Sequence, residues 1–171
     1  SWHAGKSKWG NFVNLNKNSI GIELLNKGHD HGYEKFTNSQ IKHLIKLCLI
    51  LKKKYKIKNS NIVGHSDIAP LRKIDPGEKF PWKKLSNKGV GIWYKKLNIK
   101  NKKLSEKKMN KSFFNNLFKI GYRYFNLRKS RKNDHFVVKS FQRRFNQKNI
   151  TGQIDKKTYI ISQYLAKSFK N

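Results

Sequence analysis

The chain has 171 residues, of which 40 are Lys or Arg and nine are Asp or Glu, giving a formal net charge of +31. Its hydrophobic content of 36% and aromatic content of 13% exceed what a disordered polyelectrolyte carries, so we expect a folded protein of one or two domains. The charge indicates an anionic partner such as nucleic acid, acidic lipid or an acidic polymer, and a compositional bias toward Lys explains it equally well.

Composition also excludes several kinds of protein. The single cysteine, Cys48, cannot form an internal disulfide or a thiolate metal cluster, so we interpret it as a core residue. No run of 18 apolar residues is present, so no segment is expected to span a membrane. Only six of the 40 basic residues are Arg, and the lysines are spread through every segment, which argues against a phosphate-reading surface.

The predicted elements of the first half are strands and one long helix. Residues 19–25 alternate apolar and polar side chains, which predicts a strand with Glu23 on its polar face. A capping-box start and an apolar stripe of helical period predict a helix over residues 37–55. We expect a short strand at 61–63, and the turn formers of residues 64–82 predict a loop of the kind that carries chemistry.

The second half is predicted to be helical. Residues 95–110 are dense in lysine and poor in large apolar side chains, which is typical of a linker between residues 1–94 and 111–171. Three helices are expected beyond it, at about 111–120, 134–146 and 155–168. Their apolar residues are sufficient for a small all-α domain of three helices.

Four side chains of the first half could together form a hydrolytic site. Asp75 precedes Pro76 and should be extended, so Lys73 and Asp75 point to the same side. His65 follows a predicted strand end and can lean into that space. His65 and Asp75 would supply two of the three protein ligands of a catalytic zinc. Glu23 could then accept a proton from water, and Lys73 could stabilise a negative oxygen.

Each of these residues also has a plainer interpretation. His65 alone is more often a hydrogen-bonded loop histidine, and Asp75 is more often part of a turn. Glu23 and Lys73 are ordinary as solvent-facing residues. Asp67 is expected to cap the local turn. Only the combination favours a hydrolase.

Three motifs stand out in the first half: SWHAG at 1–5, NKNSIGIEL at 16–24 and the long, highly specific GHSDIAPLRKIDPGEKFPW at 64–82. With these motifs the chain resembles the zinc-dependent N-acetylmuramoyl-L-alanine amidases of the type-2 amidase group, whose fold is shared with peptidoglycan recognition proteins. Residues 134–165 resemble the three-helix peptidoglycan-binding module of the cell-envelope branch. The resemblance implies an α/β catalytic domain, a mixed sheet flanked by helices, followed by an all-α C-terminal domain.

The resemblance also implies roles for individual residues. His65 and Asp75 match two Zn2+ ligands, Glu23 matches the catalytic glutamate, and Lys73 matches the lysine that steadies the oxyanion. Four further residues fall in segments that border the substrate groove of relatives: Trp2, His3, Ala4 and Asn16. The implied reaction is hydrolysis of the amide between N-acetylmuramic acid and L-alanine of the stem peptide.

In one respect the chain departs from the family pattern. The first zinc ligand of the family is a histidine on a strand that precedes the WHAG segment. Because the chain starts at Ser1, we expect an N-terminal truncation that removes this ligand and its strand. No spacing favours His3, His29 or His31 as a substitute. Activity is therefore expected of the full-length protein rather than of these 171 residues alone.

Two other functions remain open from the sequence. One is a non-catalytic wall-binding protein on the same fold, and the other is a nucleic-acid-binding protein, suggested by the charge of +31. The amidase hypothesis implies a monomer that acts on peptidoglycan and muropeptides, with no nucleic-acid partner. It implies a place in the bacterial cell envelope, in the periplasm or anchored to the membrane through a segment before Ser1.

Overall fold

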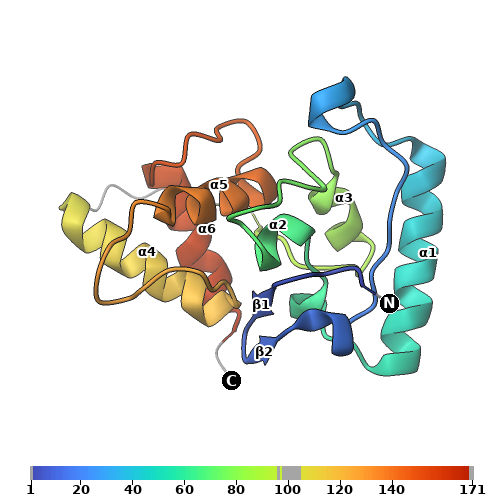
Figure 1. Cartoon of the computed structure of the whole chain (residues 1–171), viewed down its shortest axis with the longest axis horizontal. Coiled ribbons are helices and arrows are strands. Elements are labelled where there is room, and N and C mark those ends of the chain that lie inside the picture. The colour runs from blue at the N-terminus through green and yellow to red at the C-terminus, as the bar shows by residue number, and fades with distance from the viewer. Residues whose placement is uncertain (1, 96, 98–104, 170–171) are drawn as a thin grey trace.

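The computed structural model of the chain describes residues 2–95, 97 and 105–169. Figure 1 shows helix α1 at one end of the molecule and α4 at the other, with α2 and α5 between them. The elements in chain order are β1 (Lys8–Trp9), β2 (Phe12–Val13), η1 (Leu15–Lys17), η2 (His29–His31), α1 (Asn38–Tyr55), η3 (Asn59–Asn61), α2 (His65–Ile68), α3 (Trp82–Asn87), α4 (Glu106–Ile120), α5 (Asp134–Phe145) and α6 (Lys156–Lys167).

The β-structure of the described residues is a single small hairpin. β1 and β2 pair antiparallel, with Lys8 opposite Val13. The expected mixed sheet is absent from this part of the chain, and the strand predicted at 19–25 is wrong. Ile20 and Ile22, expected on a buried face, are 49% and 38% exposed. An alternating segment becomes a strand only when a neighbour accepts its backbone hydrogen bonds, and no described segment does so.

Helix α1 confirms the prediction for residues 37–55. Thr37 is its N-cap: the Thr37 hydroxyl accepts a hydrogen bond from the Gln40 backbone N–H at 3.2 Å, and the Gln40 side chain accepts one from the Thr37 N–H at 2.8 Å. The buried face of α1 carries Ile41, Leu44 and Cys48. It packs in a core cluster with Phe80 and Trp82 from the end of the predicted loop and with Leu85 and Val90 beyond it.

Between α1 and α3 the chain is mostly irregular. The strand predicted at 61–63 is wrong, because the 3-10 helix η3 ends at Asn61 and no strand follows it. The carbonyl oxygen of Ile62 accepts a hydrogen bond from the Arg144 side chain, not from a neighbouring strand. Residues 64–82 form a loop as expected, interrupted by the four-residue helix α2.

Three helices occupy the second half, close to the predicted positions. α4 begins at Glu106, five residues before the expected start and inside the predicted linker. Met109 lies one turn before Phe113 and packs against the same core, which extends the apolar stripe toward the N-terminus. The rest of the predicted linker falls largely on residues 96 and 98–104, which lie outside the described residues.

The main core joins the two halves of the chain. One cluster of buried residues contains Ala4, Trp9 and Ile68 from the first half together with Phe113 and Phe141 from the helices of the second half. The residues that the sequence assigns to two domains therefore share apolar contacts. None of the described helices is both long enough and apolar enough to cross a membrane.

Candidate functional site

His65 and Asp75, the predicted ligand pair, lie next to each other. Nδ1 of His65 is 3.1 Å from Oδ2 of Asp75. The backbone also joins the two residues, because the N–H of Ser66 donates to the carbonyl oxygen of Asp75 at 2.9 Å. The His65 side chain is 20% exposed and that of Asp75 is 56% exposed, so the pair opens to solvent. The structure confirms that these two side chains converge.

The surroundings of Asp75 favour its ionised form. Burial is the largest single influence and raises its pKa, but the hydrogen bond and charge of His65 and the weaker attraction of Lys73 together lower it below its usual value. Asp75 is therefore a carboxylate at neutral pH. Lys73 lies near enough to act on it electrostatically.

The SWHAG segment lies against His65. Nε2 of His65 is 3.3 Å from the carbonyl oxygen of Ala4. Arg72 donates hydrogen bonds to the carbonyl oxygens of Ala4 and Lys6, and its Nη2 is 3.4 Å from Nε2 of His65. Sequence reasoning missed Arg72, since an arginine that binds backbone carbonyls has no characteristic spacing. Its rarity in a lysine-rich chain was the available signal, because only the planar guanidinium can bridge several acceptors in this way.

The Asn16 side chain fixes the backbone of the SWHAG segment by hydrogen bonds. Its Oδ1 accepts hydrogen bonds from the backbone N–H groups of His3 at 2.9 Å, Ala4 at 2.7 Å and Gly5 at 3.3 Å. Trp2, by contrast, is 93% exposed. The oxygen of Asn16 is thus committed to the fold of this segment, while the indole of Trp2 is free to contact a ligand.

Glu23 is exposed and its segment runs beside SWHAG. A Cβ atom on Gly21 would lie 2.7 Å from Cβ of His3, so only glycine permits this approach. Within the described part of the chain, no hydrogen bond or ion pair joins Glu23 to His65 or Asp75. The structure therefore does not bring Glu23 into the contact that joins the other two.

The donor set fits part of a zinc site. His65 offers an imidazole nitrogen and Asp75 a carboxylate oxygen, both of which are common Zn2+ ligands. Over the ranges that the structure describes, no third His, Cys, Asp or Glu completes a cluster with them. His29 lies 3.1 Å from Glu78, outside this pair. The residues present fit two of the three protein ligands that a catalytic zinc site uses.

Two turns near the pair are held by side-chain hydrogen bonds, one local and one from a distant segment. As predicted, Asp67 caps the turn at His65, because its Oδ2 accepts a hydrogen bond from the N–H of Gly64 at 2.9 Å. The Tyr33 hydroxyl donates to the carbonyl oxygen of Pro76 at 2.7 Å and accepts from the N–H of Lys79 at 2.9 Å. Burial, partly offset by the hydrogen bond from Lys79, raises the pKa of Tyr33 to about 12.

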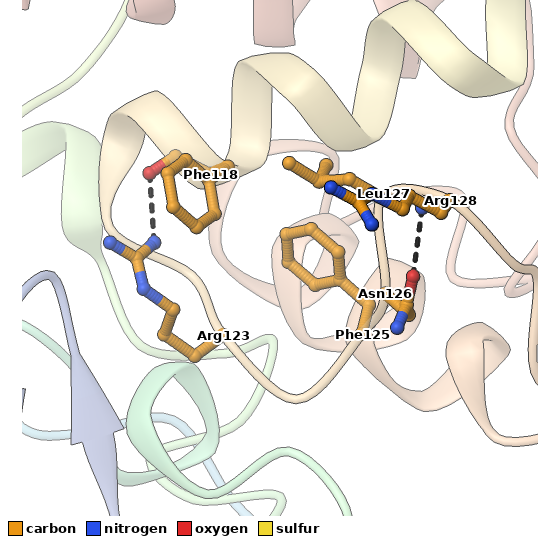
Figure 2. Close-up of a pocket in the computed structure, with 6 residues that line it drawn as sticks. All are labelled: Phe118, Arg123, Phe125, Asn126, Leu127 and Arg128. Carbon is orange, nitrogen blue, oxygen red and sulfur yellow. Dashed lines mark hydrogen bonds between the residues drawn. The ribbon is translucent and has the colours of Figure 1, made fainter.

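Two cavities lie elsewhere in the described part of the chain. One, of about 520 Å3, lies between the start of α1, residues 78–84 and residues 147–148, and has four lysines in its lining. The other, of about 330 Å3, lies beside α4 and is shown in Figure 2. Neither cavity is lined by His65 or Asp75.

The α4 cavity combines aromatic and cationic side chains. Its lining consists of Phe118, Arg123, Phe125, Asn126, Leu127 and Arg128. The Arg123 guanidinium lies 3.9 Å from the ring centre of Phe118 and donates to the Phe118 carbonyl oxygen at 2.8 Å. Asn126 accepts a hydrogen bond from the N–H of Arg128 at 2.8 Å, which fixes the turn that carries both (Figure 2). No acidic residue lines this cavity.

Comparison with known proteins supports the resemblance. The family model of N-acetylmuramoyl-L-alanine amidases matches residues 1–78. The N-acetylmuramoyl-L-alanine amidase AmiD of Escherichia coli (strain K12) is 45% identical over 98 residues, which cover 54% of this chain and 36% of that protein. The solved complex of AmiD from E. coli with anhydro-N-acetylmuramic acid-L-Ala-D-gamma-Glu-L-Lys is 32% identical, with a TM-score of 0.83 over 98% of this chain and 68% of that one. The chain belongs to the N-acetylmuramoyl-L-alanine amidase family.

A second solved structure extends the match. AmpDh3 from Pseudomonas aeruginosa is 30% identical, with a TM-score of 0.84 over 99% of this chain and 70% of that one. Because both structural matches cover nearly the whole chain, the helices α4 to α6 belong to the arrangement shared with these two structures. The aligned regions span less than half of the curated relatives, 36% of AmiD and 44% of the AmpD protein of Haemophilus influenzae.

Proposed function

We propose that this protein is a zinc-dependent N-acetylmuramoyl-L-alanine amidase, which hydrolyses the amide between N-acetylmuramic acid and the L-alanine of a stem peptide. The observation that carries the proposal is the 3.1 Å contact between His65 and Asp75, within the motif that is most specific to the family. The bound anhydromuropeptide in the AmiD complex supports the substrate class.

His65 and Asp75 are the residues that would hold the metal. When bound, Zn2+ supplies Lewis acidity that polarises the amide carbonyl and makes water a better nucleophile. The low pKa of Asp75 keeps a negative ligand available at neutral pH. Arg72 and the carbonyl oxygen of Ala4 restrict the His65 ring from its other edge.

Lys73 and Glu23 supply the two remaining catalytic roles, oxyanion stabilisation and proton transfer. The Lys73 ammonium, beside Asp75, stabilises the negative oxygen that forms when water attacks the carbonyl carbon. Glu23 takes the proton of the attacking water and passes it to the nitrogen of the leaving L-alanine. Trp2 and His3 would contact the glycan or the peptide. The side chain of Ala4 is buried in the main core, so Ala4 and Asn16 would act by holding this segment in place.

The test is product analysis with purified anhydromuropeptide and the full-length protein. We expect mass spectrometry to show free stem peptide and intact anhydro-N-acetylmuramic acid. The Glu23→Gln variant should be slower by at least about 100-fold, because a general base contributes that much or more. Full activity of Glu23→Gln, or activity that survives removal of metal by a chelator, would contradict the proposal.

One observation favours a second function, a wall-binding protein on the amidase fold that does not cleave. Over the described ranges only two metal donors converge. The same product analysis separates the two functions, since binding of muropeptide without release of stem peptide is the result expected of a non-catalytic binder.

We further propose that residues 111–171 bind peptidoglycan, and that the cavity beside α4 receives a carboxylate of the stem peptide. Arg123 and Arg128 provide the positive charge, and Phe118 and Phe125 provide apolar walls (Figure 2). The Arg128→Ala variant should pull down with purified sacculi less than the parent. Arg131→Ala, which removes the same charge outside the cavity, should bind as the parent does.

These assignments place the protein in the bacterial cell envelope, as a monomer that acts on peptidoglycan-derived muropeptides. The charge of +31 would then favour contact with an acidic wall.

A further inference from the structure

A buried ionic contact joins the second half of the chain to the turn that carries His65. Asp67 lies two residues after His65 and is 1% exposed at its side chain. Its Oδ2 accepts a hydrogen bond from Nη1 of Arg144 at 2.6 Å, and its Oδ1 accepts one from the Tyr122 hydroxyl at 2.5 Å. Both donors belong to residues beyond the predicted linker.

Arg144 contacts both ends of the loop at residues 64–82. Nη2 donates to the carbonyl oxygen of Ile62 at 2.9 Å, just before the loop. The guanidinium also lies 4.1 Å from the ring centre of Trp82, at the end of the loop. The Arg144 side chain is 2% exposed, so water cannot replace these contacts.

Ser140 adds a second connection from the same helix. It lies one turn before Arg144 on α5, and its hydroxyl donates to the carbonyl oxygen of Ser66 at 2.8 Å. The N–H of Ser66 in turn donates to the carbonyl oxygen of Asp75. Contacts from α5 therefore lead through the α2 turn to both His65 and Asp75, and Figure 1 shows α2 and α5 side by side.

We propose that α5 and Tyr122 form a positioning element for the amidase site, in which Arg144, Tyr122 and Ser140 fix the α2 turn so that His65 faces Asp75. This inference rests on the proposed function and deepens it. The helices of the second half complete the catalytic half in addition to any role in holding the wall.

The charge of Asp67 makes this dependence strong. A carboxylate at this depth is tolerable only while its charge and lone pairs are satisfied, and Arg144 is the cation that does so. Loss of Arg144 alone leaves an unpaired buried charge, which drives the α2 turn to rearrange toward water. Replacing both partners by neutral residues removes that drive, so the double variant should behave more like the parent than Arg144→Met does.

Tyr122 supports the same carboxylate as a neutral donor. Burial, followed by the negative charge of Asp67, raises the pKa of Tyr122 well above its usual value. Its hydroxyl keeps its proton and can donate throughout the working pH range. Tyr122→Phe removes this one hydrogen bond and leaves both charges in place.

The experiment compares Arg144→Met, Tyr122→Phe and the double variant Asp67→Asn/Arg144→Met with the full-length parent. The matched control is Arg143→Met, which removes the same charge from the neighbouring position of α5 without touching Asp67. Circular dichroism first sets a temperature at which each variant is folded. Three quantities are then measured: the NMR signals of the His65 ring, hydrogen exchange of the amides at 64–69, and the Kd for Co2+ as a zinc probe.

Arg144→Met should shift the His65 ring signals and raise the Kd for Co2+ by about tenfold or more, as loss of outer-shell support does. Exchange at 64–69 should rise at least about fivefold. Tyr122→Phe should change the His65 signals, the exchange and the Kd in the same direction but by less. The double variant should lie between Arg144→Met and the parent in all three quantities. Arg143→Met should match the parent. A folded Arg144→Met whose His65 signals and exchange equal those of the parent would overturn the inference, as would an equal effect of Arg143→Met.

Two results keep this inference separate from the proposed function. If the parent binds no Co2+ and cleaves no muropeptide, the amidase proposal fails, while the His65 signals and exchange still decide whether α5 positions the turn. If Arg144→Met does not fold, Tyr122→Phe decides, because unchanged His65 signals and exchange in that variant would contradict the positioning role.

Discussion

At the scale of single residues, the candidate site depends on two side chains, those of His65 and Asp75, which lie ten residues apart in the sequence. The proline after Asp75 and the strand end expected before His65 suggested that these two could meet, and they do so at 3.1 Å, although no strand directly precedes His65. The residues that restrain them were not predicted. Arg72 and Tyr33 act on backbone groups of distant segments, and such contacts leave no periodic signal in a sequence.

Tyr33 offers a test at this scale. Because burial raises its pKa to about 12, the neutral hydroxyl contributes stability that is complete below about pH 10 and is lost as the pH rises through 12. The difference in absorbance at 295 nm between the parent and Tyr33→Phe should titrate near pH 12. A difference titration centred near pH 10 would show that Tyr33 is not held between Pro76 and Lys79.

At the scale of elements, the helix predictions were confirmed, whereas the strand predictions at 19–25 and 61–63 were wrong. The capping box of α1 and the apolar stripes of the three C-terminal helices depend on neighbours within a few residues, so they were predictable. The strand at 19–25 depends on a partner elsewhere, and its alternating pattern could not supply one. The early start of α4 at Glu106 was missed because lysine is common in both linkers and helices.

The α1 cap gives the test for this scale. Thr37→Ala should lower the free energy of unfolding by about 1 kcal/mol, since it leaves the N–H of Gln40 without its acceptor. Urea denaturation measures the change. Thr37→Ser retains the hydroxyl and should stay close to the parent, whereas equal losses in both variants would mean that the methyl group, not the cap, stabilises the helix.

At the scale of the whole molecule, the division into two domains remains a prediction. Composition placed a boundary at 95–110, yet one core cluster contains Trp9 and Ile68 together with Phe113 and Phe141. The Arg144–Asp67 contact crosses the same division. A lysine-rich stretch shows where apolar residues are scarce, but it does not report which faces of the flanking segments pack together.

Calorimetry tests how far the halves depend on each other. Because the core and the buried ion pair are shared, we expect one cooperative unfolding transition for the protein. Two well-separated transitions would show that the halves unfold independently, and the shared contacts would then contribute little to stability.

Zinc binding by the full-length protein tests the central claim most directly. Titration calorimetry with Zn2+ should give one ion per chain, and X-ray absorption should show nitrogen and oxygen ligands at about 2.0–2.2 Å. His65→Ala and Asp75→Ala should each weaken binding severely, while the Glu78→Ala variant, which removes a nearby carboxylate outside the pair, should bind as the parent does. Equal affinity in the parent, His65→Ala and Asp75→Ala would contradict the account.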